Sequence, residues 1–90
     1  MAETCVTIDL ATLTDDPHGL QVEFDGEASG ETYRFAVRYD ALEALCGRYP
    51  NGEAVAVAGL HADAIATAAA HALARGYDLE LVIVSENDLV

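Results

Sequence analysis

Three segments in the first half of the chain alternate apolar with polar side chains, which is the period of strands that bury one face. They span residues 4–10, 20–25 and 32–39. The apolar side chains of the third segment are Tyr33, Phe35, Val37 and Tyr39. The pattern therefore predicts three strands, each with one face toward a core.

The connections between these strands carry turn residues. Residues 25–30 contain Gly26 and Gly30, which can take the positive φ that a hairpin turn needs. We expect the second and third strands to pair there as an antiparallel hairpin. Residues 11–19 are mostly polar and are predicted to form a loop.

The polar face of this hairpin combines both signs of charge. Glu23 and Asp25 fall on the same face as Arg34 and Arg38. Exposed cross-strand pairs of this kind contribute about 0.2–1 kcal/mol each. This face is expected to remain in contact with solvent.

A short helix is predicted to follow the hairpin, over residues 41–46. Asp40 stands at the position of an N-cap, and Glu43 stands where a capping box places its acid. Gly47 supplies the residue that commonly ends a helix in the left-handed conformation. A turn is expected over residues 48–52.

The next segment, residues 53–59, fits two structures. Its valines alternate with alanines as in an edge strand, yet Val55 and Gly59 also fall on one face of a helix that continues through Ala62. From Ala62 to Gly76 the alanine-rich sequence predicts a helix. Its polar side chains recur every four residues and form one solvent-facing stripe: Asp63, Thr67, His71 and Arg75.

A last strand is predicted over residues 78–85. Leu79, Leu81 and Ile83 are expected to face the core, which leaves Val82 and Val84 on the polar face. The predicted order is β-β-β-α-α-β in one domain spanning residues 1–90. This order predicts an α+β two-layer sandwich, in which a mostly antiparallel four-stranded sheet carries two helices on one face.

The middle and end of the chain resemble a family of short bacterial domains, the domain of unknown function 1488. The resemblance covers roughly residues 20–89 and is carried by three stretches: the hairpin followed by Ala41-Leu42-Glu43-Ala44-Leu45, residues 53–75, and the closing strand near residues 85–89. Members of that family have one long helix in the second stretch. The resemblance implies an α+β fold and a helix over residues 53–59. Gly59 and Leu60 stand where larger aromatic residues are common, which leaves the continuity of the helix near Gly59 open.

The net charge of the chain limits the classes of partner that it can bind. The chain has 16 acidic residues, four arginines, no lysine and a formal net charge of −12 at pH 7. A surface of this charge repels nucleic acids and anionic lipids and attracts basic proteins or cations. We therefore expect neither a nucleic-acid nor a membrane partner.

The sequence carries no obvious export or membrane signal. Residues 1–10 lack the features of a signal peptide, and residues 62–74 are too short and polar to span a bilayer. A cytoplasmic protein is expected. In that reducing compartment Cys5 and Cys46 are expected to be small buried side chains rather than a disulfide.

Candidate chemistry is sparse along the chain. His61 and His71 lie ten residues apart, about 15 Å along one helix, so they cannot share a metal ion. No serine or cysteine stands beside a base in sequence, and no glycine-rich phosphate loop is present. We expect no enzyme, no catalytic residue, no cofactor and no resident metal.

Two functional classes remain. The first is a protein-protein interaction or regulatory module. Its partner, another protein or a second copy, would contact either the acidic helix surface or the polar sheet face at Arg34, Ala36, Arg38, Val82 and Val84. The two valines also fit a last strand that is central in the sheet and covered on both faces. The alternative is an ion- or small-ligand-binding domain that uses the acidic loop Asp15–His18, because carboxylates are ligands of hard cations.

Overall fold

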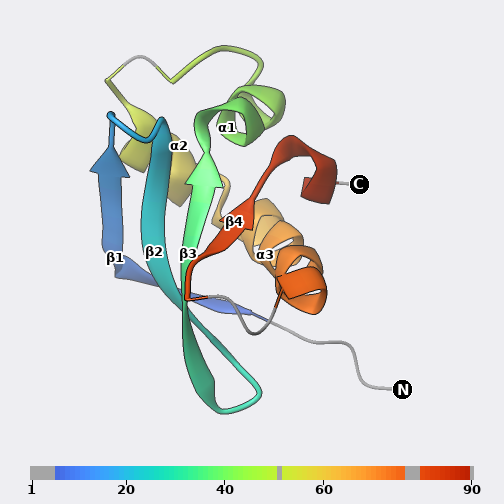
Figure 1. The fold of residues 1–90 in the computed structure, drawn as a ribbon. Helices are drawn as coiled ribbons and strands as arrows, with labels where there is room; N and C mark the ends of the chain where they lie inside the picture. Colours follow the sequence, from blue (N-terminus) through green and yellow to red (C-terminus); the bar gives the residue numbers. More distant parts are fainter. Residues whose placement is uncertain (1–5, 51, 77–79, 90) are drawn as a thin grey trace.

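The computed structural model describes residues 6–50, 52–76 and 80–89. Four strands form one sheet in the order β1-β2-β3-β4, and Figure 1 shows the helices arranged against it. The elements are β1 (Thr7–Asp16), β2 (Gln21–Ala28), β3 (Glu31–Arg38), α1 (Tyr39–Cys46), α2 (Ala54–Leu60), α3 (Ala62–Gly76), β4 (Val82–Val84) and the short 3-10 helix η1 (Glu86–Leu89). The predicted α+β class and element order are confirmed.

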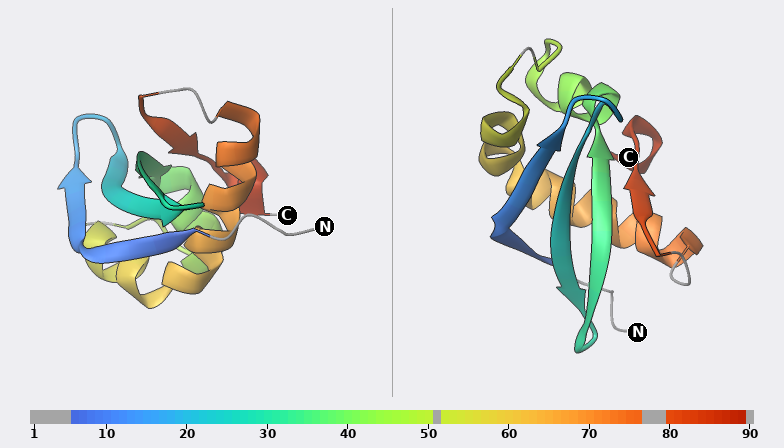
Figure 2. Two further views of the ribbon diagram at one scale, coloured as in Figure 1. Left: turned by 90° about the horizontal axis from the view of Figure 1, so that it is seen from below. Right: turned by 60° about the vertical axis from the view of Figure 1, so that its left-hand side comes forward.

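The helices lie on one side of the sheet, and no described helix lies on the other (Figure 2). The core between the two layers includes Phe24 and Phe35, whose stacked rings have centroids 5.3 Å apart. Alanines of α3 bring that helix close to the sheet: Ala68, Ala69 and Ala72. The uncovered side of the sheet carries charged side chains of β2 and β3.

The hairpin of β2 and β3 is confirmed, but its turn is shorter than predicted. Ala28 pairs with Glu31, so the turn consists of Ser29 and Gly30 alone. Both have positive φ, 55° and 80°, as a type I′ turn requires. Gly26 lies inside β2 instead, where it pairs with Ile8 and Tyr33. A Cβ atom there would lie only 2.7 Å from the ring of Phe35, which explains why this strand position is a glycine.

Strand β1 is longer than predicted and is bulged. The predicted loop over residues 11–19 is wrong up to Asp16, because pairing with β2 resumes after an irregularity between Asp9 and Thr14. Within this irregularity the Thr12 hydroxyl accepts the Asp25 N–H at 2.8 Å. A side chain thus satisfies an amide that the interrupted ladder leaves without a strand partner.

Strand β4 pairs with β3 in parallel, so the sheet is mixed. The predicted faces of this strand are wrong. Val82 and Val84 are 1% and 0% exposed in the core, whereas Ile83 is 38% exposed. Parallel register places the two valines level with Phe35 and Val37, the core residues of β3. Residues 78–79 of the predicted strand lie outside the described residues.

The helices begin and end for partly different reasons than predicted. The N-cap of α1 is Arg38 and no side chain caps the helix, so the predicted capping box of Asp40 and Glu43 is wrong. Asp40 instead occupies the first turn, where a negative charge favours the helix dipole. Gly47 ends α1 as predicted, with φ of 85° and its N–H donating to the Glu43 carbonyl at 2.8 Å.

The second helical region is confirmed as helix but not as one rod. Helices α2 and α3 meet at an angle of 89°, immediately after Leu60. The polar stripe on α3 is exposed as predicted: Asp63, Thr67, His71 and Arg75. In the described part of the chain no single helix has the length and apolarity to cross a membrane, although the bent pair of α2 and α3 meets that test when both are taken together.

Candidate functional site

The uncovered side of the sheet, which we call the open face, is built from alternate residues of all four strands. They are Thr7 and Asp9 of β1, Gln21, Glu23, Asp25 and Glu27 of β2, Thr32, Arg34, Ala36 and Arg38 of β3, and Ile83 of β4. Three of the five predicted contact residues lie here: Arg34, Ala36 and Arg38. The other two, Val82 and Val84, belong to the core, and Ile83 takes their place as the exposed apolar side chain.

One ion-pair cluster orders the centre of the open face. Arg34 donates to Asp25 at 2.8 Å and to Glu23 at 3.3 Å, which confirms the predicted cross-strand pairing for this arginine. The hydrogen bond that Arg34 donates to Asp25 is the main cause that raises the pKa of Arg34. All three side chains are partly exposed, so the cluster contributes about 1 kcal/mol or less per pair.

Arg38 differs from Arg34. Among the described residues no carboxylate lies within 4.0 Å of its guanidinium. Ala36, between the two arginines along β3, is fully buried although it lies outside the core cluster. Its register partners Glu23 and Ile83 carry longer side chains that flank it.

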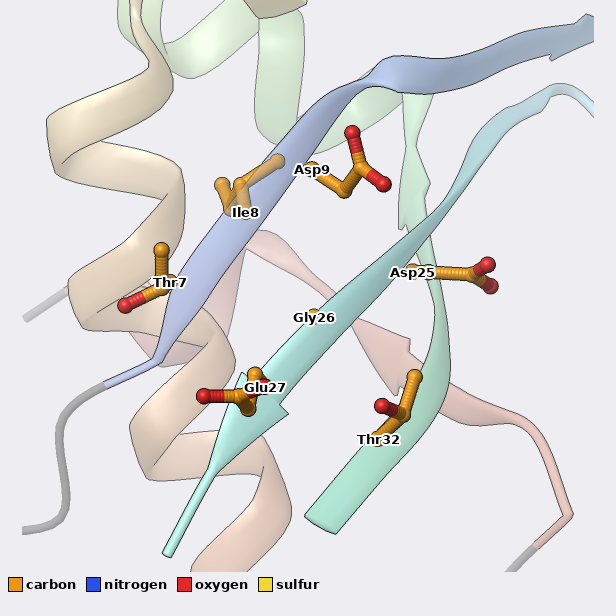
Figure 3. Close-up of a pocket in the computed structure, with 7 residues that line it drawn as sticks. All are labelled: Thr7, Ile8, Asp9, Asp25, Gly26, Glu27 and Thr32. Carbon is orange, nitrogen blue, oxygen red and sulfur yellow. The ribbon is translucent and has the colours of Figure 1, made fainter. Parts of the chain in front are cut away.

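An acidic hollow lies next to this cluster, between β1 and β2. It has a volume of about 510 Å³ and is lined by Thr7, Ile8, Asp9, Asp25, Gly26, Glu27 and Thr32. Figure 3 shows Asp9 and Asp25 on the neighbouring strands, with Glu27 and Thr32 farther along. Asp9 pairs with Asp25 across the two strands, and Thr7 pairs with Glu27.

The carboxylates of the hollow have few cationic neighbours. Asp25 is bound by Arg34, and the Asp9 carboxylate accepts the Ala11 N–H at 3.1 Å. In the described part of the chain no basic side chain lies within 4.0 Å of Asp9 or Glu27. The hollow is therefore a negative, open surface that favours a cationic group.

The acidic loop that sequence suggested as a cation site has a structural role. The Tyr39 hydroxyl donates to Asp15, and the Asp16 carboxylate accepts the Gly19 N–H at 3.2 Å. Burial is the main cause that raises the pKa of Tyr39 to about 12, and the Asp15 carboxylate adds to it. No group of three or more His, Cys, Asp or Glu side chains within the described ranges is placed to hold a metal ion.

A further polar cluster joins the end of the chain to α3. Asp88 is only 3% exposed, and its carboxylate binds Arg75 and accepts the Ser85 N–H at 3.0 Å. The His71 ring nitrogen Nδ1 lies 2.9 Å from the Asp88 carbonyl oxygen. Sequence reasoning missed this cluster, because its partners are up to 17 positions apart and share no local pattern.

Two cysteines and two histidines remain among the residues that the sequence pointed to. Cys46 is half-buried, and its thiol donates to the Arg48 carbonyl at 2.9 Å. Cys5 lies outside the described residues. His61 is half-buried and His71 is exposed on α3.

Comparison with known proteins identifies no relative of this chain. The chain matches no family model, no curated protein and no solved structure. The resemblance to the domain of unknown function 1488 stays a prediction.

Proposed function

We propose that this chain is a non-enzymatic interaction module of the cytoplasm that binds a basic segment of another protein on the open face of its sheet. The acidic hollow carries the proposal. Asp9 and Glu27 face an open volume of about 510 Å³ without a basic partner among the described residues. A lysine or arginine side chain supplied by a partner fits the charge and the size of that hollow.

The rest of the open face suits the same partner. Arg34 and its two carboxylates form a fixed polar centre. Ile83 adds an exposed apolar contact beside it. The formal net charge of −12 steers a basic partner toward the molecule and repels nucleic acids. A second copy brings the same charge, so the proposal favours a different protein over a homodimer.

The first test compares two variants of equal charge. Asp9→Asn with Glu27→Gln neutralises the hollow while keeping oxygen acceptors, including one for the Ala11 N–H. Asp40→Asn with Glu43→Gln neutralises two exposed carboxylates on α1 instead. Binding of a hexa-arginine peptide is measured by titration calorimetry at low salt, after circular dichroism has shown that both variants fold.

Two lost exposed ion pairs amount to about 0.4–2 kcal/mol, so affinity for the peptide should fall about two- to thirtyfold in the hollow variant. The α1 variant should retain affinity to within about twofold. Equal losses in both variants would refute the proposal, because binding would then depend on total charge alone. A pull-down from lysate with the same three proteins then identifies partners that only the hollow variant loses.

A further inference from the structure

Helix α2 has a composition that normally belongs inside a protein. Its seven residues, Ala54–Leu60, contain no polar side chain. A helix that is apolar on all sides is usually buried on all sides. In this structure only Ala54 and Ala58 are buried, and Val57 packs partly against the core.

The other residues of α2 form one contiguous exposed face. Val55, Ala56, Gly59 and Leu60 are spaced at i, i+1, i+4 and i+5, which places them on the same side of a helix. Val55 is 36% exposed and Leu60 is 83% exposed. The 89° angle between α2 and α3 follows directly after Leu60, so α3 does not cover this end of the face. We call these four residues the α2 face.

Gly59 has no function inside the monomer that the structure reveals. A Cβ atom at this position would have no heavy atom within 4 Å, and its φ lies outside the left-handed region. Glycine inside a helix destabilises the fold by about 0.5–1 kcal/mol relative to alanine. A glycine on an exposed helix face allows another backbone to approach closely.

Charge distinguishes among the possible occupants of the α2 face. Exposed acidic residues border it in sequence, Glu53 before α2 and Asp63 after it. Glu53 also lies 3.8 Å from the exposed Arg48, in an ion pair that contributes about 0–1 kcal/mol. The formal net charge of −12 opposes docking of a second copy and of an anionic lipid surface. A partner whose apolar stripe is bordered by basic residues complements both the apolar face and its acidic border.

We propose that the α2 face binds an amphipathic helix of another protein, whose apolar stripe is bordered by arginine or lysine. Leu60 and Val55 provide the apolar contact, and Gly59 lets the two helix backbones come close. Glu53 and Asp63 attract the basic border. This site is independent of the open face, since it lies on the helical side of the sheet.

The test uses the full chain and three synthetic peptides of about 18 residues, or five helical turns. The first carries a leucine stripe bordered by arginines. The second has glutamate in place of each arginine, and the third has the composition of the first in scrambled order. Binding is measured by fluorescence anisotropy of labelled peptides. The first peptide should bind about tenfold or more tightly than the others.

The protein variants locate the binding surface. Leu60→Gln and Gly59→Gln change side chains that touch little else, so both should fold, and both should weaken binding of the first peptide about tenfold. Gly59→Gln should at the same time raise or preserve the melting temperature, which a purely structural role of Gly59 would not give. The control is Leu20→Gln, the same substitution at another exposed leucine, and it should leave binding unchanged.

Several results would overturn the proposal. Equal affinity for the ordered and scrambled peptides, or equal loss in Leu60→Gln and Leu20→Gln, would show that charge alone drives binding. A Leu60-dependent dimer in sedimentation equilibrium would assign the face to a second copy. Leu60-dependent binding to phosphatidylcholine vesicles would assign it to a lipid surface. None of these results alters the hexa-arginine test of the open face, so the two proposals fail separately.

Discussion

Gly26 should be among the least replaceable residues of the sheet, and Gly26→Ala tests the packing around it. An added Cβ would lie 2.7 Å from Cε2 of Phe35 and 2.9 Å from Cγ1 of Val6. Carbon atoms in good contact are about 3.5–4.0 Å apart. Phe35 cannot easily move away, because its ring stacks on Phe24 and makes an edge contact with the ring of Tyr33. The centroids of the Phe35 and Tyr33 rings are 6.4 Å apart.

The expected loss follows from these contacts. Overpacking of a buried site costs about 1–3 kcal/mol. Replacing glycine also reduces the conformational entropy of the unfolded chain, which offsets at most about 1 kcal/mol of this cost. A 90-residue domain has a free energy of unfolding of roughly 5–13 kcal/mol, so the net loss is a substantial fraction of it. With a urea m-value near 1 kcal/mol/M, the midpoint should fall by roughly 1–2 M.

The assay is urea unfolding followed by far-UV circular dichroism, with Gly59→Ala as the matched control. The control adds the same methyl group where no heavy atom lies within 4 Å, so it should raise stability by about 0.5–1 kcal/mol. Val6→Ala removes one of the two close contacts and should make Gly26→Ala less costly in the double variant. A midpoint for Gly26→Ala at or above that of the unchanged protein would refute the close packing at this glycine.

Three further substitutions test other parts of the structure. Ser29→Asn should stabilise the fold by up to about 1 kcal/mol, because asparagine tolerates the positive φ of the hairpin turn better than serine, and a lowered melting temperature would contradict this. Tyr39→Phe removes the hydrogen bond to Asp15 and should cost about 1 kcal/mol near neutral pH. The folded pKa of about 12 lies above the ordinary value of 10.0, so the contribution of Tyr39 is fully present below pH 10 and is lost as the pH rises through 12. Stability measured against pH should show a smaller alkaline loss in the Tyr39→Phe variant than in the unchanged protein. The part that remains comes from Tyr33, whose pKa is raised by its hydrogen bond to Glu31. Asp88→Asn should cost about 1–3 kcal/mol because it weakens a buried carboxylate cluster, whereas the exposed Asp63→Asn should change the urea midpoint little.

The strands and helices could be predicted where the sequence pattern is compatible with only one structure. The alternation of β2 and β3 permits one buried face, and with it the pairing of Arg34 with Glu23 and Asp25. The irregularity in β1 was not predictable, because it depends on the Thr12 hydroxyl meeting an amide that is distant in sequence. The acidic hollow was missed for the same reason, since the register of β1 brings Asp9 opposite Asp25.

In strand β4 the sequence pattern does not predict which side chains face the core. Residues 81–84 are apolar at every position, so alternation cannot decide which side chains face the core. The parallel pairing with β3 decides it, and a shift of one residue reverses every side chain. The predicted positions of Val82 and Val84 on the polar face were therefore wrong for a reason that sequence alone does not contain. The clear alternation of β3 placed Arg34, Ala36 and Arg38 on the open face, although Ala36 is fully buried there.

Gly26 in β2 and Gly59 in α2 both lie inside an element, but only Gly26 is required by the packing of the fold. Gly26 is explained by the core, because Phe35 and Val6 occupy the space of a side chain there. Gly59 and the exposed Leu60 have no such explanation within the chain, and Gly59 lowers the stability of α2 in a small domain of modest stability. The carboxylates Asp9 and Glu27 on the open face likewise add repulsion without a basic neighbour in the described part of the structure. Features that weaken the isolated fold thus occur on two separate surfaces, and a basic partner with an apolar stripe would relieve both.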